Sequence, residues 1–442
     1  MAGLIMAGQL ILALAILVTF HELGHYLAAR AFGIRVEKFY LFFDAFGKKL
    51  FSFKKGDTEY GIGWLPIGGY VKISGMIDES VDTEQMKSEP QPWEFRSKPA
   101  WQRFIVMIGG IVVNLILGYV FYLVVLLGFQ KDYVTMDTVN QHGIIVGPVA
   151  EAIGFEEGDK LISLNGETHK RFRDYSSLEA MFGGDMVVER DGEQKTITIP
   201  SDYFKVLKNN KGAFIDCRST VWVKELSSEL DYATQAGMLP GDEIISINDT
   251  ALKSYSHMVT LLWHAKEKTV PVVVKRGGEE VSLTSQVDTG GRLGFRPKVI
   301  EYPNERTAYT FGSAIKYSFK ESWDVIYYNV VGLGKIFSGD VPAKEVKSII
   351  GMASFFGAKW DWQRFWSLTA MISLALAFMN ALPIPALDGG HMVFLTYEMI
   401  VGKPAPERVL LVAQYIGMAI LLTLMALTMG NDIWQIIKSK FL

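Results

Sequence analysis

Long uncharged stretches are the dominant pattern of the chain. Four windows contain no Asp, Glu, Lys or Arg, namely residues 4–20, 104–130, 365–387 and 409–431. A helix needs about 20 apolar residues to cross a bilayer. One such window is compatible with the buried helix of a soluble protein, but four of them favour membrane spans. The pattern therefore predicts a polytopic α-helical membrane protein with four transmembrane helices.

The basic residues beside these windows predict the orientation of the helices. No Lys or Arg precedes the first window, which also argues against a cleaved signal peptide. By the positive-inside rule, residues 30–103 are cytoplasmic and the N-terminus lies on the outer side. Alternation of the spans then places residues 131–364 and the C-terminus on the outer side as well. The basic residues that decide this are Arg30, Arg35, Lys38, Arg96, Lys98 and Arg103.

The long outer segment contains a repeat. AEAIGFEEGDKLISLNG (150–166) and ATQAGMLPGDEIISIND (233–249) share seven of 17 positions, and the similarity resumes at VVERDGE (187–193) and VVKRGGE (273–279). The Gly-Asp pair favours a tight turn, and the alternating apolar residues after it favour a half-buried strand. The signature A-x-x-x-G-x-x-x-G-D-x-I-x-x-I-N resembles PDZ domains, which add an extended peptide to a sheet edge. A purely structural role for both copies stays open.

Composition narrows the class of protein further. Hydrophobic residues make up 49% of the chain, and 44 Lys and Arg against 47 Asp and Glu give a net charge of −3. This balance provides no dominant basic face, so we expect no nucleic-acid binding. The single cysteine, Cys217, excludes an intrachain disulfide and a multi-cysteine zinc site. Any metal must therefore be held by His and carboxylate side chains.

The end of the first window carries His21-Glu22-Leu23-Gly24-His25. On a helix, His21 and His25 share one face and can bind a single metal, with Glu22 beside it. The bare pattern HExxH also occurs by chance. Here it continues an apolar run, where ionisable groups are costly and usually functional.

The third window ends in NALPIPALDGG (380–390). Its two prolines should break the helix and turn Asp388 inward, although a simple helix stop is the alternative. Because the first and third spans run in the same direction, HELGH and Asp388 lie at the same membrane face. From Leu4 to His21 a helix rises about 26 Å, which places the site inside the bilayer near its cytoplasmic side. Two imidazoles and one carboxylate would leave one position of a zinc ion open for chemistry.

HELGH in the first span, NALPIPALDGG in the third and the tandem PDZ-like repeats between spans two and three resemble the site-2 protease family of intramembrane zinc metalloproteases (peptidase M50), in its proteobacterial branch. The resemblance covers essentially the whole chain. It implies one Zn²⁺ per chain, held by His21, His25 and Asp388, with Glu22 as the general base. The residues that it assigns to the substrate or to the shape of the site are Asn380, Pro383, Pro385, Gly61, Gly63 and Asn114. The second span departs from the family's G-P-x-x-N pattern, because Ile111 replaces the proline between Gly110 and Asn114.

Two further segments fit this chemistry. EYGIGWLPIGGYVKI, at residues 59–73, is glycine-rich and alternating, and resembles the family's membrane-embedded β-hairpin, here about residues 57–75. An edge strand there could hold an unwound substrate extended, whereas a plain surface hairpin is the alternative.

After the repeats, apolar residues recur at helical spacing and predict an amphipathic helix, either at the outer interface or packed on the protein. They are Ile315, Phe319, Trp323, Ile326 and Val330.

These features predict five regions: residues 1–130 with spans one and two, 131–215 and 216–300 with one PDZ-like α+β domain each, 301–364 with the amphipathic helix, and 365–442 with spans three and four.

We expect cleavage within a single-span membrane protein already trimmed on its outer side. The resemblance implies an anti-sigma factor substrate, also remnant signal peptides, and a bacterial inner membrane with both termini and the PDZ-like domains periplasmic. Partners are then this substrate, membrane lipid and a possible peptide or protein ligand of the PDZ-like domains. The rival hypotheses are a non-catalytic PDZ scaffold with a structural metal and a soluble-type metallopeptidase tethered to the membrane.

Overall fold

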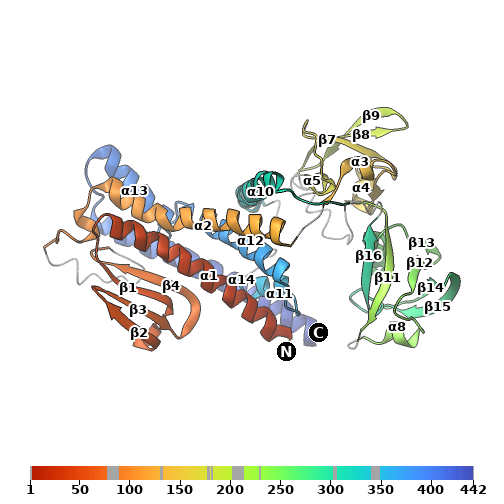
Figure 1. Ribbon diagram of the computed structural model, residues 1–442, viewed down its shortest axis with the longest axis horizontal. Coiled ribbons are helices and arrows are strands. Elements are labelled where there is room, and N and C mark those ends of the chain that lie inside the picture. The colour runs from red at the N-terminus through yellow and green to blue at the C-terminus, as the bar shows by residue number, and fades with distance from the viewer. Residues whose placement is uncertain are drawn as a thin grey trace. The chain divides into compact units, whose positions relative to one another are not determined.

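A computed structural model describes residues 2–76, 89–129, 133–176, 180, 183–201, 214–227, 230–301, 306–339 and 349–441 (Figure 1). The chain forms two compact units. The first, which we call the helical unit, comprises residues 1–131, 309–334 and 342–442. The second, which we call the repeat unit, comprises residues 132–308 and 335–341.

The helical unit is built mainly from helices. They are α1 (Ala2–Ala31), α2 (Ala100–Gly128), α10 (Phe311–Phe337), α11 (Ile349–Phe356), α12 (Trp362–Ala381), α13 (Asp388–Val401) and α14 (Glu407–Phe441). Within the described chain, three segments are long and apolar enough to cross a membrane: Gly3–Ala31, Ala100–Gly128 and Arg408–Asn431. They agree with the first, second and fourth expected spans. The third expected span contains α12, which packs against α2, and its crossing of the membrane stays a prediction.

The two prolines of the third window end α12 as the sequence predicts. The helix stops at Ala381, and Leu382 before Pro383 has an extended backbone (φ −65°, ψ 143°), because a residue followed by proline is disfavoured in the helical region. Ala386 then takes a positive φ of 87°. This turn allows a new helix, α13, to begin at Asp388.

A four-stranded sheet follows α1 and corrects the expected hairpin at residues 57–75. Its strands are β1 (Val36–Phe43), β2 (Lys49–Lys55), β3 (Thr58–Gly63) and β4 (Leu65–Ile73), in the order β2-β3-β1-β4. β3 and β4 are therefore not partners: β1 lies between them, parallel to β3 and antiparallel to β4. The aromatic and β-branched run VEKFYLFF has strong strand propensity, and the hairpin prediction overlooked it. β4 is an edge strand of this sheet.

The two sequence repeats form similar arrangements of strands in the repeat unit. In the first copy β7, β8 and β9 form one sheet and β6 pairs with β10; in the second, β12, β14 and β15 are consecutive and β11 pairs with β16. Each copy has its own hydrophobic core. The strands of the first copy are β6 (Ile145–Val146), β7 (Lys160–Leu164), β8 (Gly184–Arg190), β9 (Glu193–Ile199) and β10 (Ile215–Asp216). Those of the second are β11 (Ser219–Leu226), β12 (Glu243–Ile247), β13 (Thr250–Ala251), β14 (Thr269–Arg276), β15 (Glu279–Gln286) and β16 (Phe295–Glu301).

Short elements complete the structure. In the repeat unit they are β5 (Tyr133–Val134), α3 (Met136–Val139), α4 (Pro148–Ala152), α5 (Phe172–Tyr175), α8 (Tyr232–Gln235), α9 (Tyr255–His264) and β17 (Arg306–Thr307). Two 3₁₀ turns, η1 (Ala45–Gly47) and η3 (Phe95–Ser97), lie in the helical unit. The PDZ assignment of the two copies stays a proposal.

The repeated Gly-Asp turn is fixed in the same way in both copies. Asp159 accepts two hydrogen bonds from Arg190, at 2.7 and 2.8 Å, and Asp242 accepts two from Arg276, both at 2.7 Å. Each arginine also donates to the carbonyl of the glycine five residues before its aspartate. Both carboxylates are buried. A bidentate ion pair with a buried carboxylate thus joins the turn to β8 in the first copy and to β14 in the second.

Removing Asp242 should destabilise the second copy. Asp242→Ala leaves Arg276 and the backbone N–H of Leu239 without their acceptor, which we expect to cost about 2–3 kcal/mol. The measurement is thermal unfolding of the full protein in detergent, read by proteolysis within residues 216–300. Glu280→Ala, which removes an exposed carboxylate of β15, is the control and should change stability by less than about 0.5 kcal/mol. Equal effects of the two variants would contradict the prediction.

Candidate metal centre

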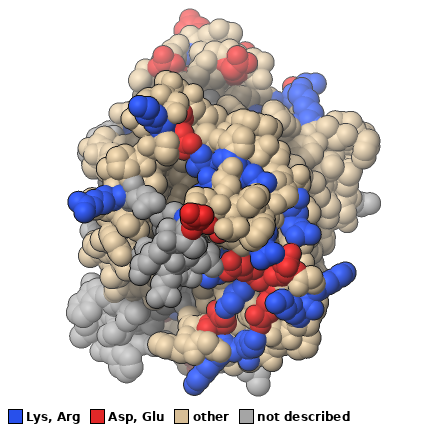
Figure 2. Space-filling view, turned by 90° about the vertical axis from the view of Figure 1, so that its left-hand side faces the viewer, with Lys and Arg blue, Asp and Glu red and all other residues tan. Residues whose placement is uncertain are grey.

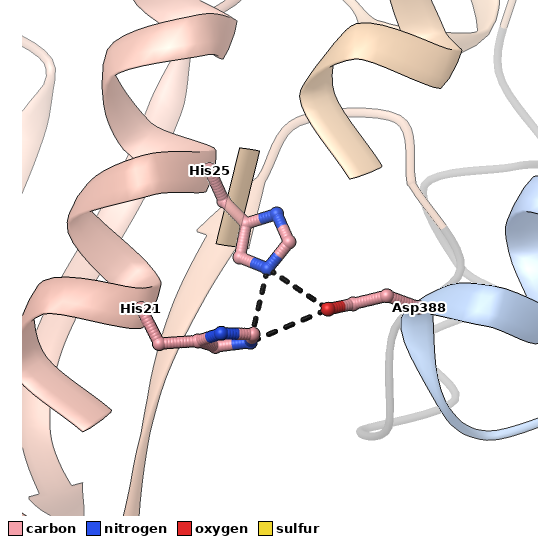
Figure 3. Close-up of side chains that lie close together, drawn as sticks. All are labelled: His21, His25 and Asp388. Carbon is pink, nitrogen blue, oxygen red and sulfur yellow. Dashed lines mark hydrogen bonds and ion pairs between the residues drawn. The ribbon is translucent and has the colours of Figure 1, made fainter. Parts of the chain in front are cut away.

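Three predicted ligands converge in the helical unit (Figure 3). His21 and His25 project from successive turns of α1, and Asp388 is the first residue of α13. The two histidine Nε2 atoms are 3.2 Å apart, and each is 3.3 Å from Asp388 Oδ2. His25 is 5% exposed. The structure therefore brings together one carboxylate oxygen and two imidazole nitrogens, although His25 and Asp388 are 363 residues apart in the sequence.

The spacing of these atoms fits a zinc ion. A tetrahedral ion with bonds of about 2.0–2.1 Å holds its ligand atoms about 3.3–3.4 Å apart, which matches the three observed separations. Asp388 Oδ2 is buried and makes no hydrogen bond to any residue that the structure describes. Such an oxygen carries a desolvation cost that a bound cation would offset. The donor set, two nitrogens and one oxygen, is one that zinc accepts at catalytic sites.

The other ring nitrogen of each histidine is also engaged. His25 Nδ1 lies 2.8 Å from the backbone oxygen of Val106 in α2, and His21 Nδ1 lies 3.2 Å from the amide nitrogen of Asn114. Asn114 is fully buried and its backbone oxygen accepts a hydrogen bond of 2.7 Å from Ser373 of α12. Both ligands on α1 are thus oriented by groups of α2.

Glycines in α1 and α2 create the room for these contacts. A Cβ on Gly24 would lie 2.3 Å from the oxygen of Gly109, and one on Gly110 would lie 2.5 Å from His25 Nε2. No side chain fits at either position, because real Cβ contacts are not that short. Nothing in the local sequence around Gly110 predicts this role, because the contact joins two helices that are distant in sequence. Ile111 in place of the family's proline leaves α2 one continuous helix, Ala100–Gly128.

A cavity of about 1090 Å³ opens beside the three ligands. Glu22, Asn114 and Asn380 line it from the helices, and residues 68–73 of β4 line it from the sheet. The amide nitrogen of Asn380 lies 3.3 Å from His21 Nε2. Glu22 and Val71 of β4 line the same cavity. The candidate base, the metal ligands and an edge strand therefore share one space.

Four other predicted residues have different surroundings. Gly61 and Gly63 lie in the inner strand β3, where added Cβ atoms would come within 2.5 Å of the Tyr40 ring and 2.2 Å of the Phe43 backbone. Their small size thus serves sheet packing. Pro383 and Pro385 form the turn between α12 and α13. For all four, contact with substrate stays a prediction.

Two further residues line the cavity, His391 of α13 and Gln414 of α14. Gln414 was not predicted from the sequence. The signal for Gln414 was present, since a lone amide in an apolar window is expensive and therefore suggests a function.

Comparison with known proteins agrees with this geometry. The model of Peptidase family M50 matches residues 9–424. The regulator of sigma-E protease RseP of Salmonella typhimurium (strain 14028s) is 30% identical over 453 residues, covering 96% of this chain and 97% of that protein. Metalloprotease MmpA of Caulobacter vibrioides is 27% identical over 473 residues, covering 99% and 98%. The regulator of sigma E protease of Haemophilus influenzae is 29% identical over 448 residues, covering 96% and 98%.

The chain belongs to peptidase family M50, the site-2 protease family. It is a metalloendopeptidase, and its family implies zinc as the metal.

The three ligands should decide the metal content of the purified protein. We expect about one zinc per chain in the wild type and a loss of most of it in His25→Ala, because two ligands rarely retain the ion. The measurement is elemental analysis after dialysis against a weak chelator. His391→Ala removes an imidazole that lines the same cavity and should keep the zinc. Loss of zinc in His391→Ala but not in His25→Ala would contradict this ligand set.

Proposed function

We propose that the protein is an intramembrane protease that hydrolyses a peptide bond in the transmembrane segment of a single-span membrane protein. The observation that carries the proposal is the position of the site. His21 is the twentieth residue of α1, about 29 Å from its start at 1.5 Å per residue, so a helix that spans the bilayer presents its ligands near the far face.

The residues of the site have distinct roles in this reaction. A bound zinc ion would supply Lewis-acid activation of water and polarise the scissile carbonyl. Glu22 accepts the proton of the attacking water and passes it to the departing amine, so that the carboxylate is regenerated. The amide N–H of Asn380, close to His21 Nε2, is available to stabilise the negative charge that develops on the carbonyl oxygen.

Asn114 has a different role from the expected substrate contact. Its Oδ1 is buried without a hydrogen-bond partner in the described chain, while Nδ2 faces His21 Nδ1. Amide orientation is an assignment, and rotating this amide by half a turn places Oδ1 beside His21 Nδ1. His21 Nδ1–H then donates to Asn114 Oδ1 and leaves the Nε2 lone pair for the metal, as Val106 does for His25. We therefore assign Asn114 to orienting His21.

The edge strand β4 explains how a helical substrate becomes cleavable. A helix hides its peptide bonds, so it must be unwound before attack. β4 is an edge strand whose residues 68–73 line the cavity, and an extended segment that adds to this edge would be held by main-chain hydrogen bonds. Because Glu22 and Val71 of β4 line the same cavity, the added segment would pass beside the base.

The surface of the sheet supports a place at the membrane boundary. Large apolar side chains are exposed on β2 and the turn before it, with Phe46 at 93%, Leu50 at 72% and Phe51 at 58%. Such a cluster is costly in water and fits lipid. Acidic and basic side chains are interspersed on the end of the molecule that carries the sheet (Figure 2). We infer that this end lies at the cytoplasmic face of a bacterial inner membrane, with both termini and the repeat unit in the periplasm.

The repeat unit is proposed to select the substrate. β16 is an edge strand of its sheet, which is where PDZ-like domains add a peptide. The names of the relatives that regulate sigma-E support an anti-sigma factor, already trimmed on its periplasmic side, as the substrate class. Peptide binding at β16 and exclusion by size are separable. A bulky substitution on β16 should release cleavage of an untrimmed substrate only if peptide binding at this edge selects the substrate.

Glu22→Gln should abolish cleavage without loss of zinc. Glutamine keeps the shape of the side chain but accepts no proton at neutral pH, so we expect a decrease of at least about 10³-fold in rate. The measurement is cleavage of a reporter with one transmembrane helix, trimmed on its periplasmic side, by purified wild type and variant in the same detergent.

Zinc content is the control for this comparison. Equal cleavage by the two proteins with equal zinc would assign the reaction to another enzyme. Zinc that stabilises the wild type without any cleavage of the trimmed reporter would favour the non-catalytic scaffold instead.

Substitutions of Asn114 test its role at His21. Asn114→Leu removes the acceptor and should weaken zinc binding by about 10–100-fold. Asn114→Asp restores an oxygen at the same place and should bind zinc about as well as the wild type. The measurement is zinc retention against a graded chelator series. If the aspartate variant is as weak as the leucine variant, the amide N–H rather than the oxygen contacts His21 and the proposed rotation is wrong.

A further inference from the structure

Gln414 is a polar side chain that the reaction described so far does not use. It lies in α14, inside the apolar segment Arg408–Asn431, and is only 5% exposed. Its side chain makes no hydrogen bond to any residue within the described ranges. It lines the cavity of the metal ligands and also a smaller adjoining cavity of about 120 Å³.

The position of Gln414 is fixed by a neighbouring glycine. A Cβ on Gly417 would lie 1.5 Å from the carbonyl oxygen of Pro385, so α14 touches the backbone of the turn that precedes Asp388. Residues 414 and 417 are three apart and share a helix face. The contact at Gly417 therefore directs Gln414 toward the same turn and into the cavity.

An extended substrate creates a need that Gln414 can meet. The N–H and C=O groups of a strand point alternately to its two edges, and β4 can pair with only one of them. The other edge would enter a partly apolar site with unsatisfied groups, each costing a substantial part of the binding free energy. A carboxamide offers both a donor and an acceptor, and it matches the hydrogen-bonding groups of a peptide.

We propose that Gln414 binds the main chain of the substrate segment on the edge that β4 leaves free, donating from Nε2 to a substrate carbonyl and accepting at Oε1 from a substrate N–H. This inference rests on the proposed function. It adds to that function the way in which the substrate is recognised. Contacts along both edges of the extended substrate segment would recognise its main chain and not its side chains. The bound segment then supplies the hydrogen bonds that the side chain of Gln414 does not make within the described residues.

Gln414→Leu preserves volume and removes the amide. We expect kcat/KM for the trimmed single-helix reporter to fall by about 10-fold, mainly through a higher KM, since the lost contact is made by bound substrate as well as by the transition state. Zinc content and thermal stability should match the wild type. The control is Thr423→Val on an exposed part of α14, which should leave all three measurements unchanged.

A backbone-ester series separates substrate contact from a structural role. Synthetic transmembrane peptides each carry one ester in place of an amide near the scissile bond, which removes one N–H donor. One ester position should lower kcat/KM for the wild type and have no further effect on Gln414→Leu. Ester effects that are the same in both proteins, or a loss of zinc in Gln414→Leu, would overturn the proposal.

Glu22→Gln, run beside these proteins, distinguishes the two hypotheses. Cleavage by the wild type but not by Glu22→Gln, with Gln414→Leu as active as the wild type, would overturn only the role of Gln414. Absence of cleavage by the wild type would overturn the protease function, and the role of Gln414 with it.

Discussion

The close contact between α1 and α2 is the constraint on which the site depends. Gly24 and Gly109 let the two backbones touch, and Gly110 leaves space for the imidazoles. Only at this separation can α2 supply a carbonyl to His25 and an amide to His21. A side chain at Gly110 would occupy the place of the ligands themselves. The metal centre is therefore a property of a helix pair, completed by Asp388 from a third helix.

Polar groups in this apolar setting are arranged in a chain. Ser373 donates a hydrogen bond to the backbone oxygen of Asn114, the side chain of Asn114 contacts His21, and His21 faces Asp388. Each link offsets the cost of burying the next polar group, which is high where water is scarce. Asp388 Oδ2 and the side chain of Gln414 end this arrangement without a hydrogen-bond partner among the residues described. We propose that Asp388 Oδ2 binds the metal and that the side chain of Gln414 binds the substrate main chain.

Local patterns made the ligands predictable from sequence, whereas long-range pairing was not predictable. His21 and His25 follow from helical spacing, and Asp388 from a proline-broken helix end. The hairpin was wrong because β1 enters between β3 and β4, and a sequence pattern does not state which strands pair. The repeat revealed Asp159 and Asp242, but their bonds to Arg190 and Arg276 need the folded sheet. Gln414 stands out as an amide in the fourth apolar window, but its place in the cavity depends on the contact between α14 and the turn before Asp388.

Recognition through the main chain has a consequence for selectivity. A site that reads backbone groups by β4 and Gln414 accepts many sequences, because every residue except proline offers the same N–H and C=O. Discrimination must then come from how readily a substrate helix unwinds, or from a separate selector before the site. A helix with glycine or other poor helix formers unwinds at lower cost. The repeat unit, with its own cores and an edge strand, β16, is the part of the chain suited to the second task.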